Sequence, residues 1–323
     1  MKRIAVILLA LLLLVFASCD EKAPANEQIL GESTDVVEDV VEDVVEESVK
    51  KNYPDNILME DKHYINSSSC VLGNEAVLRR DIQTVTFKDT LSDMPADAWD
   101  VSDEKNGSVM AWVVDGVNLY IAGEGGVTAK DCTRLFLYYK NLKSVDFGGA
   151  FYTDISDSLF EMFAKCESLE TLDLSSWKTS HITNFGGMFL DCFHLTSINL
   201  SGWDTSNAMS MYCMFDSCSR LENVDVSHFE TSKVQSFDSM FSSCYELASI
   251  DVSGWDTSSA KRMFSMFGGC SILTELDLSG WDTSNVESMY AMFSYCMKLT
   301  SVGDLKIPEG CDTTDMFKGT PLE

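Results

Sequence analysis

The chain has 323 residues and a formal net charge of −28, with 51 Asp and Glu against 23 Lys and Arg. This acidity argues against nucleic acid as a partner, because its phosphates would be repelled, and the length allows one or two domains. The 11 cysteines include no Cys-x-x-Cys pair, so we expect no zinc and no other metal or cofactor.

The first residues are typical of an exported bacterial lipoprotein. A charged start, Met1-Lys2-Arg3, precedes an apolar run over residues 4–16 that is too short to span a bilayer comfortably. The run ends in Phe16-Ala17-Ser18-Cys19, which resembles a lipobox with Phe in place of the usual Leu. We predict a signal peptide over 1–18, lipidation of Cys19 and a place in the cell envelope, at the surface of the outer membrane. An ordinary secretory peptide is the alternative.

Residues 19–50 predict an acidic, disordered tether. Within them, residues 35–47 alternate pairs of valine with acidic residues, with a period of four residues. Valine is a mediocre helix former, and like charges four residues apart repel each other on a helix. A solvated spacer is therefore the main interpretation, and a short helix that docks on a partner is the alternative.

Residues 51–134 predict a small mixed β cap. Residues 82–87, 109–114 and 117–122 are rich in branched side chains and indicate strands. Asp115-Gly116 separates the last two, which is a signal for a two-residue hairpin. A stack of repeats leaves its first apolar face bare, and this segment is placed to cover that face.

From residue 135 to 323 the sequence repeats with a period of 26 residues. A fixed period of this size is typical of stacked coils. We predict a repeat solenoid, a leucine-rich-repeat-like right-handed coil with short parallel strands and degenerate terminal coils. Two columns of equivalent residues carry the period: Trp177, Trp203, Phe229, Trp255 and Trp281, and Cys166, Cys192, Cys218, Cys244, Cys270 and Cys296.

One repeat shows how a coil would be built. Leu169-x-x-Leu172-x-Leu174-x-x-Trp177 has leucine-rich-repeat spacing, with Trp where Asn is usual. Leu172 and Leu174 predict a short strand with its apolar side inward, and the Met-Phe pair before each Cys predicts one helical turn. The residues between the leucines would then face outward as a candidate interaction face: Asp173, Asn199, Asp225, Asp251 and Asp277.

The two inward columns predict core rather than chemistry. We interpret the aromatic column as a buried spine, with an exposed row that stacks on sugar rings as the alternative. We interpret the cysteine column as small buried hydrophobes. Turns of the type Asp204-Thr205-Ser206 follow three of the aromatic residues, with Lys178 and Glu230 in place of Asp after the other two. A calcium ladder, which needs six to eight oxygens, is the alternative. Disulfide pairing among four other cysteines is left open: Cys70, Cys132, Cys213 and Cys311.

The repeated phrase supports a resemblance to a known family. Residues 276–286 read Leu-Asp-Leu-Ser-Gly-Trp-Asp-Thr-Ser-Asn-Val, and Met-Phe and Cys follow. This phrase resembles the BspA-like leucine-rich repeat surface proteins, first described as a mycoplasma domain of unknown function. The resemblance covers about residues 135–317. It implies a bacterial surface protein and, in some members, adhesion to host matrix proteins, and it carries over no catalytic residue.

We therefore expect a lipid-anchored interaction protein that adheres to an unidentified host or bacterial surface protein. A glycan-binding accessory lipoprotein that uses the aromatic column is the alternative. An enzyme is not expected, because the sequence has neither a His-Glu-x-x-His nor a Gly-x-Ser-x-Gly motif. The four histidines also form no column: His63, His181, His194 and His228.

Overall fold

The computed structural model describes residues 54–61, 66 and 68–323. The predicted signal peptide, Cys19, the tether and His63 lie outside these residues. Lys51–Glu323 belongs to one compact unit. Its described part consists of strands and turns, and its only helical segment is a 3-10 turn at Arg79–Asp81. No helix in this part is long and apolar enough to cross a membrane.

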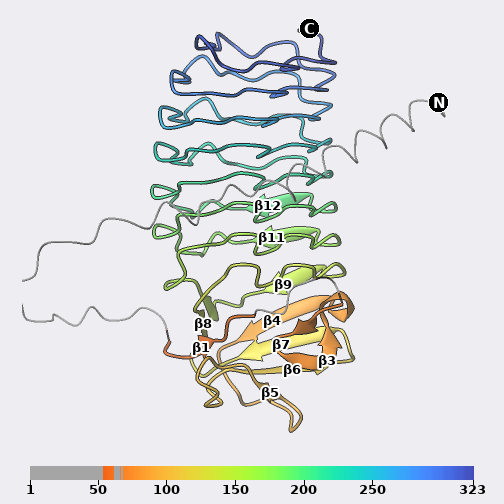
Figure 1. Ribbon diagram of the computed structural model, residues 1–323. Coiled ribbons are helices and arrows are strands. Elements are labelled where there is room, and N and C mark those ends of the chain that lie inside the picture. Colours follow the sequence, from red (N-terminus) through yellow and green to blue (C-terminus); the bar gives the residue numbers. More distant parts are fainter. Residues whose placement is uncertain (1–53, 62–65, 67) are drawn as a thin grey trace, which may run out of the picture. The chain divides into compact units, whose positions relative to one another are not determined.

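Five strands form a mixed sheet near the start of the described chain (Figure 1). They are arranged in the order β5-β6-β7-β4-β9. Their bounds are β4 Thr84–Lys88, β5 Trp99–Asp100, β6 Met110–Val114, β7 Asn118–Ala122 and β9 Ser144–Asp146. The strands predicted over 82–87, 109–114 and 117–122 are confirmed as β4, β6 and β7.

The predicted hairpin is also confirmed. β6 and β7 pair antiparallel, and both turn residues have positive φ, 53° at Asp115 and 72° at Gly116. Positive φ at both central residues matches the turn to the twist of the two strands, and Asp-Gly adopts it readily.

Three smaller sheets complete the strands. β1 (Ile57–Leu58), β8 (Val127–Ala129) and β10 (Phe151–Tyr152) form a parallel sheet in the order β1-β8-β10. β2 (Cys70–Val71) and β3 (Asn74–Leu78) pair antiparallel. β11 (Thr171–Asp173) and β12 (Ser197–Asn199) pair parallel, with Leu172 beside Ile198.

The prediction of a leucine-rich-repeat solenoid is wrong. The described chain has several small, separate sheets, and no parallel sheet continues through all the repeats. After β12 the β pairing between repeats is limited to isolated parallel bridges, such as Ser236 with Arg262. The strand expected at Leu172–Leu174 occurs as β11, but its equivalents beyond β12 are not strands.

The helical turn predicted before each Cys is also wrong, and the hydrogen bonds show why. The N–H groups of Glu161, Phe163 and Lys165 donate to carbonyls of the next repeat, at 2.9, 2.9 and 2.7 Å. Glu161 and Lys165 have positive φ, 51° and 61°. An α-helix would need negative φ throughout and bonds to the residue four before. The apolar spacing alone could not distinguish these two backbone paths.

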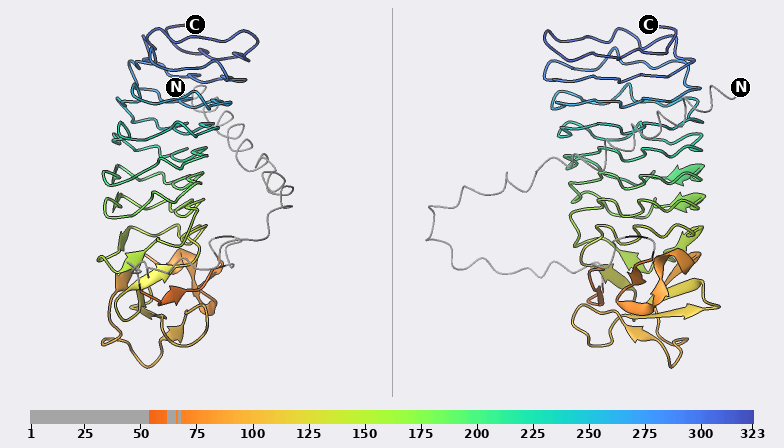
Figure 2. Two further views of the ribbon diagram at one scale, coloured as in Figure 1. Left: turned by 90° about the vertical axis from the view of Figure 1, so that its left-hand side faces the viewer. Right: turned by 45° about the vertical axis from the view of Figure 1, so that its right-hand side comes forward.

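Successive repeats nevertheless lie next to each other (Figure 2), and equivalent rings of neighbouring repeats are in contact. The clearest case is a column of phenylalanine rings whose neighbouring centroids are 5.2–6.0 Å apart in stacked pairs. Such pairs add about 0.5–1.5 kcal/mol each to the gain from burial. The column comprises Phe136, Phe163, Phe189, Phe215, Phe241, Phe267, Phe293 and Phe317.

A buried ion pair lies where the N-terminal segment meets the first repeat. Arg79 and Asp61 have fully buried side chains, and their Nη2 and Oδ2 atoms are 2.7 Å apart. The same guanidinium donates to the Leu137 carbonyl at 2.6 Å and lies 5.1 Å from the ring centroid of Tyr139. Tyr139 occupies the position that Cys holds in later repeats, so Arg79 joins the cap to the repeat interior.

Candidate functional site

The aromatic column lies in the interior. Its rings are only 2–4 % exposed. Where the residue is Trp203, Trp255 or Trp281, the indole Nε1 donates to a carbonyl of the preceding repeat at 2.9–3.0 Å. Rings held in this way stabilise the fold and cannot stack on a sugar, so the aromatic column is not a binding surface.

The one column position without an indole is compensated by its neighbour. The Phe229 side chain has no N–H. The carbonyl that an indole at this position would bond is that of Leu200, by analogy with the carbonyls bonded by Trp203, Trp255 and Trp281. The His228 side chain occupies this place instead, with its Nε2 atom 3.1 Å from the Leu200 oxygen. The Trp203 N–H also donates to this oxygen, at 3.0 Å, so the His228 ring supplies a second hydrogen bond and has a structural role.

We predict that His228→Ala lowers the free energy of unfolding by about 0.5–1.5 kcal/mol, because the Leu200 carbonyl loses one of its two donors and keeps only the Trp203 N–H. His228→Ala combined with Phe229→Trp should recover part of this loss, since the new indole can donate to the same oxygen. Urea unfolding followed by circular dichroism measures both variants. A double variant less stable than His228→Ala would contradict this role.

The cysteine column is buried, and its thiols are unreactive. Each thiol donates to the carbonyl of a Phe in the preceding repeat at 3.0–3.2 Å. Desolvation raises the pKa of all six thiols well above the usual range, to about 12 for Cys296. The thiols therefore stay protonated and are not nucleophiles. The described cysteines form no disulfide, which includes Cys70, Cys132, Cys213 and Cys311.

The predicted acidic face is exposed, but its polar atoms are engaged in turns. Asp173, Asn199, Asp225, Asp251 and Asp277 each accept a hydrogen bond from the backbone N–H two residues later, at 3.0–3.2 Å. For Asp173, Asp225 and Asp277, bonds from the following serine hold the carboxyl pKa below its usual value. These side chains support the backbone turn, and exposure alone does not make them a binding site.

The second acidic series has the same local role. Asp204 accepts from the N–H of Ser206 at 3.0 Å. The intervening Thr205 is buried; its hydroxyl donates to the Glu230 carbonyl and accepts from the Glu230 N–H, at 3.0 and 2.8 Å. These bonds explain the Asp-Thr-Ser phrase without a cation. Across the residues that the structure describes, no group of three or more His, Cys, Asp or Glu is placed to hold a metal.

Charged side chains elsewhere on the repeats pair between neighbours. Three such pairs are Arg134 with Glu161, Lys140 with Glu167 and Lys165 with Asp191, at N–O distances of 2.6, 2.6 and 2.9 Å.

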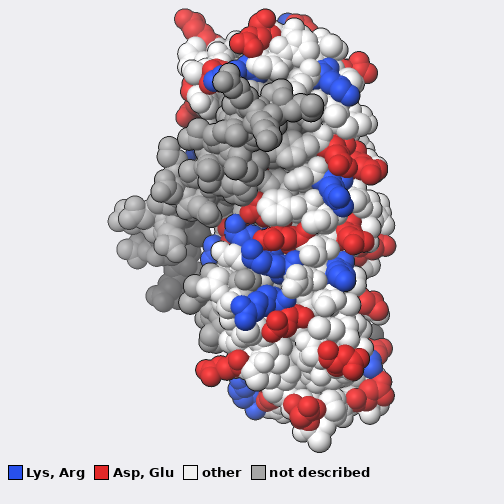
Figure 3. Space-filling view, turned by 90° about the vertical axis from the view of Figure 1, so that its right-hand side faces the viewer, with Lys and Arg blue, Asp and Glu red and all other residues white. Residues whose placement is uncertain are grey.

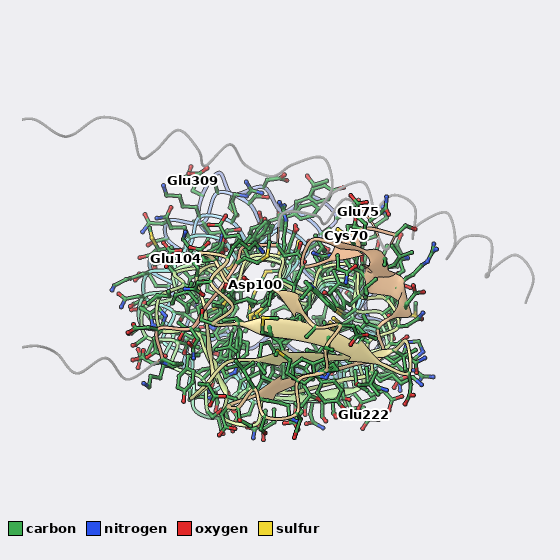
Figure 4. The ribbon with its side chains drawn as sticks, turned by 90° about the horizontal axis from the view of Figure 1, so that it is seen from below. Cys70, Glu75, Asp100, Glu104, Glu222 and Glu309 are labelled. Atoms are coloured by element: carbon green, nitrogen blue, oxygen red, sulfur yellow. The ribbon has the colours of Figure 1, made fainter. Side chains whose placement is uncertain are left out.

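The face in Figure 3 shows basic and acidic side chains interleaved. Viewed from below, sulfur atoms gather near the centre of the cross-section while Glu222 and Glu309 lie at its rim (Figure 4). Exposed pairs of this kind contribute about 0–1 kcal/mol each.

A polar groove of ≈ 850 Å³ crosses five consecutive repeats. The groove is shallow and open to solvent. Two columns of side chains line it, one on each side of a buried apolar column that includes Ile182 and Val234. The first column is His181, Asn207, Lys233, Ser259 and Asn285, and the second is Thr183, Met209, Gln235, Lys261 and Glu287.

The two columns differ in how firmly they are held. In the first column, Asn207, Ser259 and Asn285 each donate to a serine carbonyl of the preceding repeat, at 2.7, 2.5 and 2.8 Å. In the second column the backbone is bound instead, because each N–H donates to the carbonyl 26 residues earlier at 2.8–3.0 Å. The groove therefore combines a row of polar side chains bonded to the preceding repeat with a second row in which Thr183 alone donates its side chain to a backbone carbonyl, that of Asp157 at 3.3 Å.

Sequence reasoning missed this groove. Its signal is a polar–apolar–polar triplet that returns every 26 residues, as in His181-Ile182-Thr183 and Lys233-Val234-Gln235. The outer members change from repeat to repeat, so they do not form a column of identical letters. The residues that recur in every repeat lie in the core. The two variable polar positions of the triplet, one on each side of its apolar residue, line the groove.

These features define an all-β protein of 26-residue repeats with a polar, outward-facing groove. The family described as "Mycoplasma protein of unknown function, DUF285" matches residues 157–253 and 222–322. The two matches together cover residues 157–322, more than half of the 323 residues, and the chain belongs to this family. No curated protein and no solved structure matches the chain.

Proposed function

We propose that this protein is a non-catalytic binding protein of a bacterial surface, lipid-anchored at Cys19, that holds an extracellular macromolecule on the outward side of its repeats. The observation that carries the proposal is the groove, in which side chains from five repeats face solvent. The inward side chains that recur in every repeat are packed in the core. The outer positions that vary between repeats are therefore the ones available for recognition. Repeats that present a long open surface are well suited to this role.

The described histidines support binding rather than catalysis. The rings of His181, His194 and His228 each bond to a backbone carbonyl of an earlier repeat, at 2.9, 2.7 and 3.1 Å. Each bond uses one of the two ring nitrogens, and a general base also needs a reacting group within reach of the other one. These three rings lie in separate places and brace the backbone.

Within the family, we propose the finer assignment to the BspA-like surface proteins. It rests on the repeated phrase Leu-Asp-Leu-Ser-Gly-Trp-Asp-Thr-Ser-Asn-Val and on the lipobox-like start. Adhesion to a host or neighbour-cell protein is the function that this assignment suggests.

Anchoring is tested by Cys19→Ala. We expect the variant to lose labelling by a fatty-acid probe and to leave the membrane fraction, because acyl chains supply the binding energy to the bilayer. Cys70→Ala, which changes a thiol outside the lipobox, should keep both properties. Unchanged labelling of Cys19→Ala would rule out the anchor.

Binding is tested with the purified full-length protein on immobilised matrix proteins, mucins and bacterial surface polysaccharides. We expect saturable binding to at least one of them, lost when the protein is unfolded in urea. Absence of saturable binding to the whole panel would contradict the proposed function.

A further inference from the structure

We propose that the groove binds an acidic glycan, a chain of sugars bearing carboxylates, extended along the direction in which the repeats follow one another. This inference rests on the proposed function and assigns the class of its partner. Four observations carry it: the local charge, the free lysines, the braced polar row and the saturated backbone.

The charge balance of the groove is the reverse of that of the chain. The whole protein has 51 acidic and 23 basic residues, whereas the groove is lined by Lys233 and Lys261 against Glu287 alone. At physiological ionic strength the Debye length is about 8 Å. Distant carboxylates are therefore largely screened, and a carboxylate inside the groove interacts mainly with the two lysines and with Glu287.

Both lysines are available to a ligand. Neither forms an ion pair with a residue in the described part of the chain, although most basic side chains of the repeats do. Lys233 donates to the Asn207 side-chain oxygen at 2.5 Å, which holds it in place and leaves its charge uncompensated. Lys233 and Lys261 belong to successive repeats, which lie about 4.8 Å apart where parallel backbones bridge.

The remaining groove residues fit hydroxyl groups. The Gln235 amide can both donate and accept, and Asn207 and Asn285 each keep one amide hydrogen after bonding to a serine carbonyl. The Ser259 hydroxyl donates its only hydrogen to Ser232 and can accept. Bonds to serine carbonyls hold three of them before a ligand arrives, which lowers the ordering cost of binding. A polyhydroxylated chain carries a series of hydroxyl groups that donate and accept, and it can form hydrogen bonds with successive repeats.

An extended peptide fits less well. Peptides that bind in extended form gain affinity by pairing their main chain with free backbone groups. Along the second column these groups are already used, for example in the bonds from Gln235 N to Met209 O and from Lys261 N to Gln235 O, at 3.0 and 2.9 Å. Met209, half exposed, is the one apolar side chain that lines the groove, so a peptide would also lack pockets for apolar anchors.

The test compares the full-length protein with Lys233→Gln/Lys261→Gln by calorimetry and glycan pull-down. The probes are short oligosaccharides of galacturonate, alginate and hyaluronan, with methyl-esterified oligogalacturonate as the uncharged counterpart. We expect at least one acidic probe to bind and the double variant to bind it at least tenfold more weakly. If that probe is the galacturonate, esterification should cause a similar loss. Glutamine keeps a polar side chain but removes the charge.

Lys143→Gln/Lys298→Gln is the matched control, because it removes the same charge from two exposed lysines outside the groove. It should bind as the unaltered protein does. Failure of all three acidic probes, equal loss in the control, or stronger binding of poly-glutamate than of any acidic glycan would overturn the inference. In these cases saturable binding to a matrix protein would leave the proposed function standing.

Discussion

Trp203→Ala is expected to lower the free energy of unfolding by about 3–5 kcal/mol through loss of the buried ring. The ring is 4 % exposed and lies 5.2 Å from Phe185 and 6.3 Å from Phe229, centroid to centroid. The substitution also removes the indole hydrogen bond to the Leu174 carbonyl, which keeps the Trp177 N–H as a donor at 3.1 Å, so this loss adds about 0.5–1.5 kcal/mol. The variant should therefore unfold at much lower urea concentration.

The measurement is urea unfolding followed by far-ultraviolet circular dichroism. Met209→Ala is the control, because Met209 is 50 % exposed, and its effect should stay within about 0.5 kcal/mol. Trp203→Phe should lie between the two, since it keeps an aromatic ring but not the hydrogen bond. An unchanged midpoint for Trp203→Ala would mean that the ring is an exposed platform after all.

Arg79→Met is expected to cost about 3–5 kcal/mol, because it leaves the Asp61 carboxylate buried without its counter-charge. Asp61 Oδ2 would keep the Leu72 N–H at 3.0 Å as a hydrogen-bond donor. That neutral donor does not replace a guanidinium at 2.7 Å. The Leu137 and Cys70 carbonyls would also lose their donor, so the contact between cap and first repeat should weaken.

Thermal or urea unfolding compares Arg79→Met with its neighbour Arg80→Met. Arg80 has a half-exposed side chain, and its Nε lies 3.9 Å from the Asp81 carboxylate, so its loss should cost less than about 1 kcal/mol. Adding Asp61→Leu to Arg79→Met should restore part of the stability, since an apolar pair leaves no buried charge. Equal stabilities of the two arginine variants would contradict a stabilising buried pair.

The variants of Trp203 and Arg79 are expected to change stability, whereas the variants of the groove lysines are expected to change binding. Trp203 and Arg79 act inside the protein, where their removal leaves cavities or unpaired polar groups. Lys233 and Lys261 act in the groove, and their replacement should leave the unfolding midpoint nearly unchanged. Binding and stability can therefore be measured on different variants.

Much of the interior could be predicted from the sequence. A residue that recurs every 26 positions as Trp or Cys must meet its own copy in the next repeat if the repeats pack alike. Apolar side chains in such a row are buried because apolar surface is expelled from water. This reasoning places Trp203 and Cys218 in the core, where the structure has them at 4 % and 0 % exposure. The hairpin at Asp115-Gly116 follows from local backbone preference alone.

By itself, then, the sequence determined the period, the inward columns and the local turns, because burial and turn chemistry depend on residue type. Only the tertiary structure decided the backbone path of the Met-Phe segments, since their N–H groups find acceptors in the next repeat, about 26 residues away. It also decided the pairing of Arg79 with Asp61 and the joining of His181, Lys233 and Lys261 into one groove. Such contacts join residues that are remote along the chain, and no local pattern of letters specifies them.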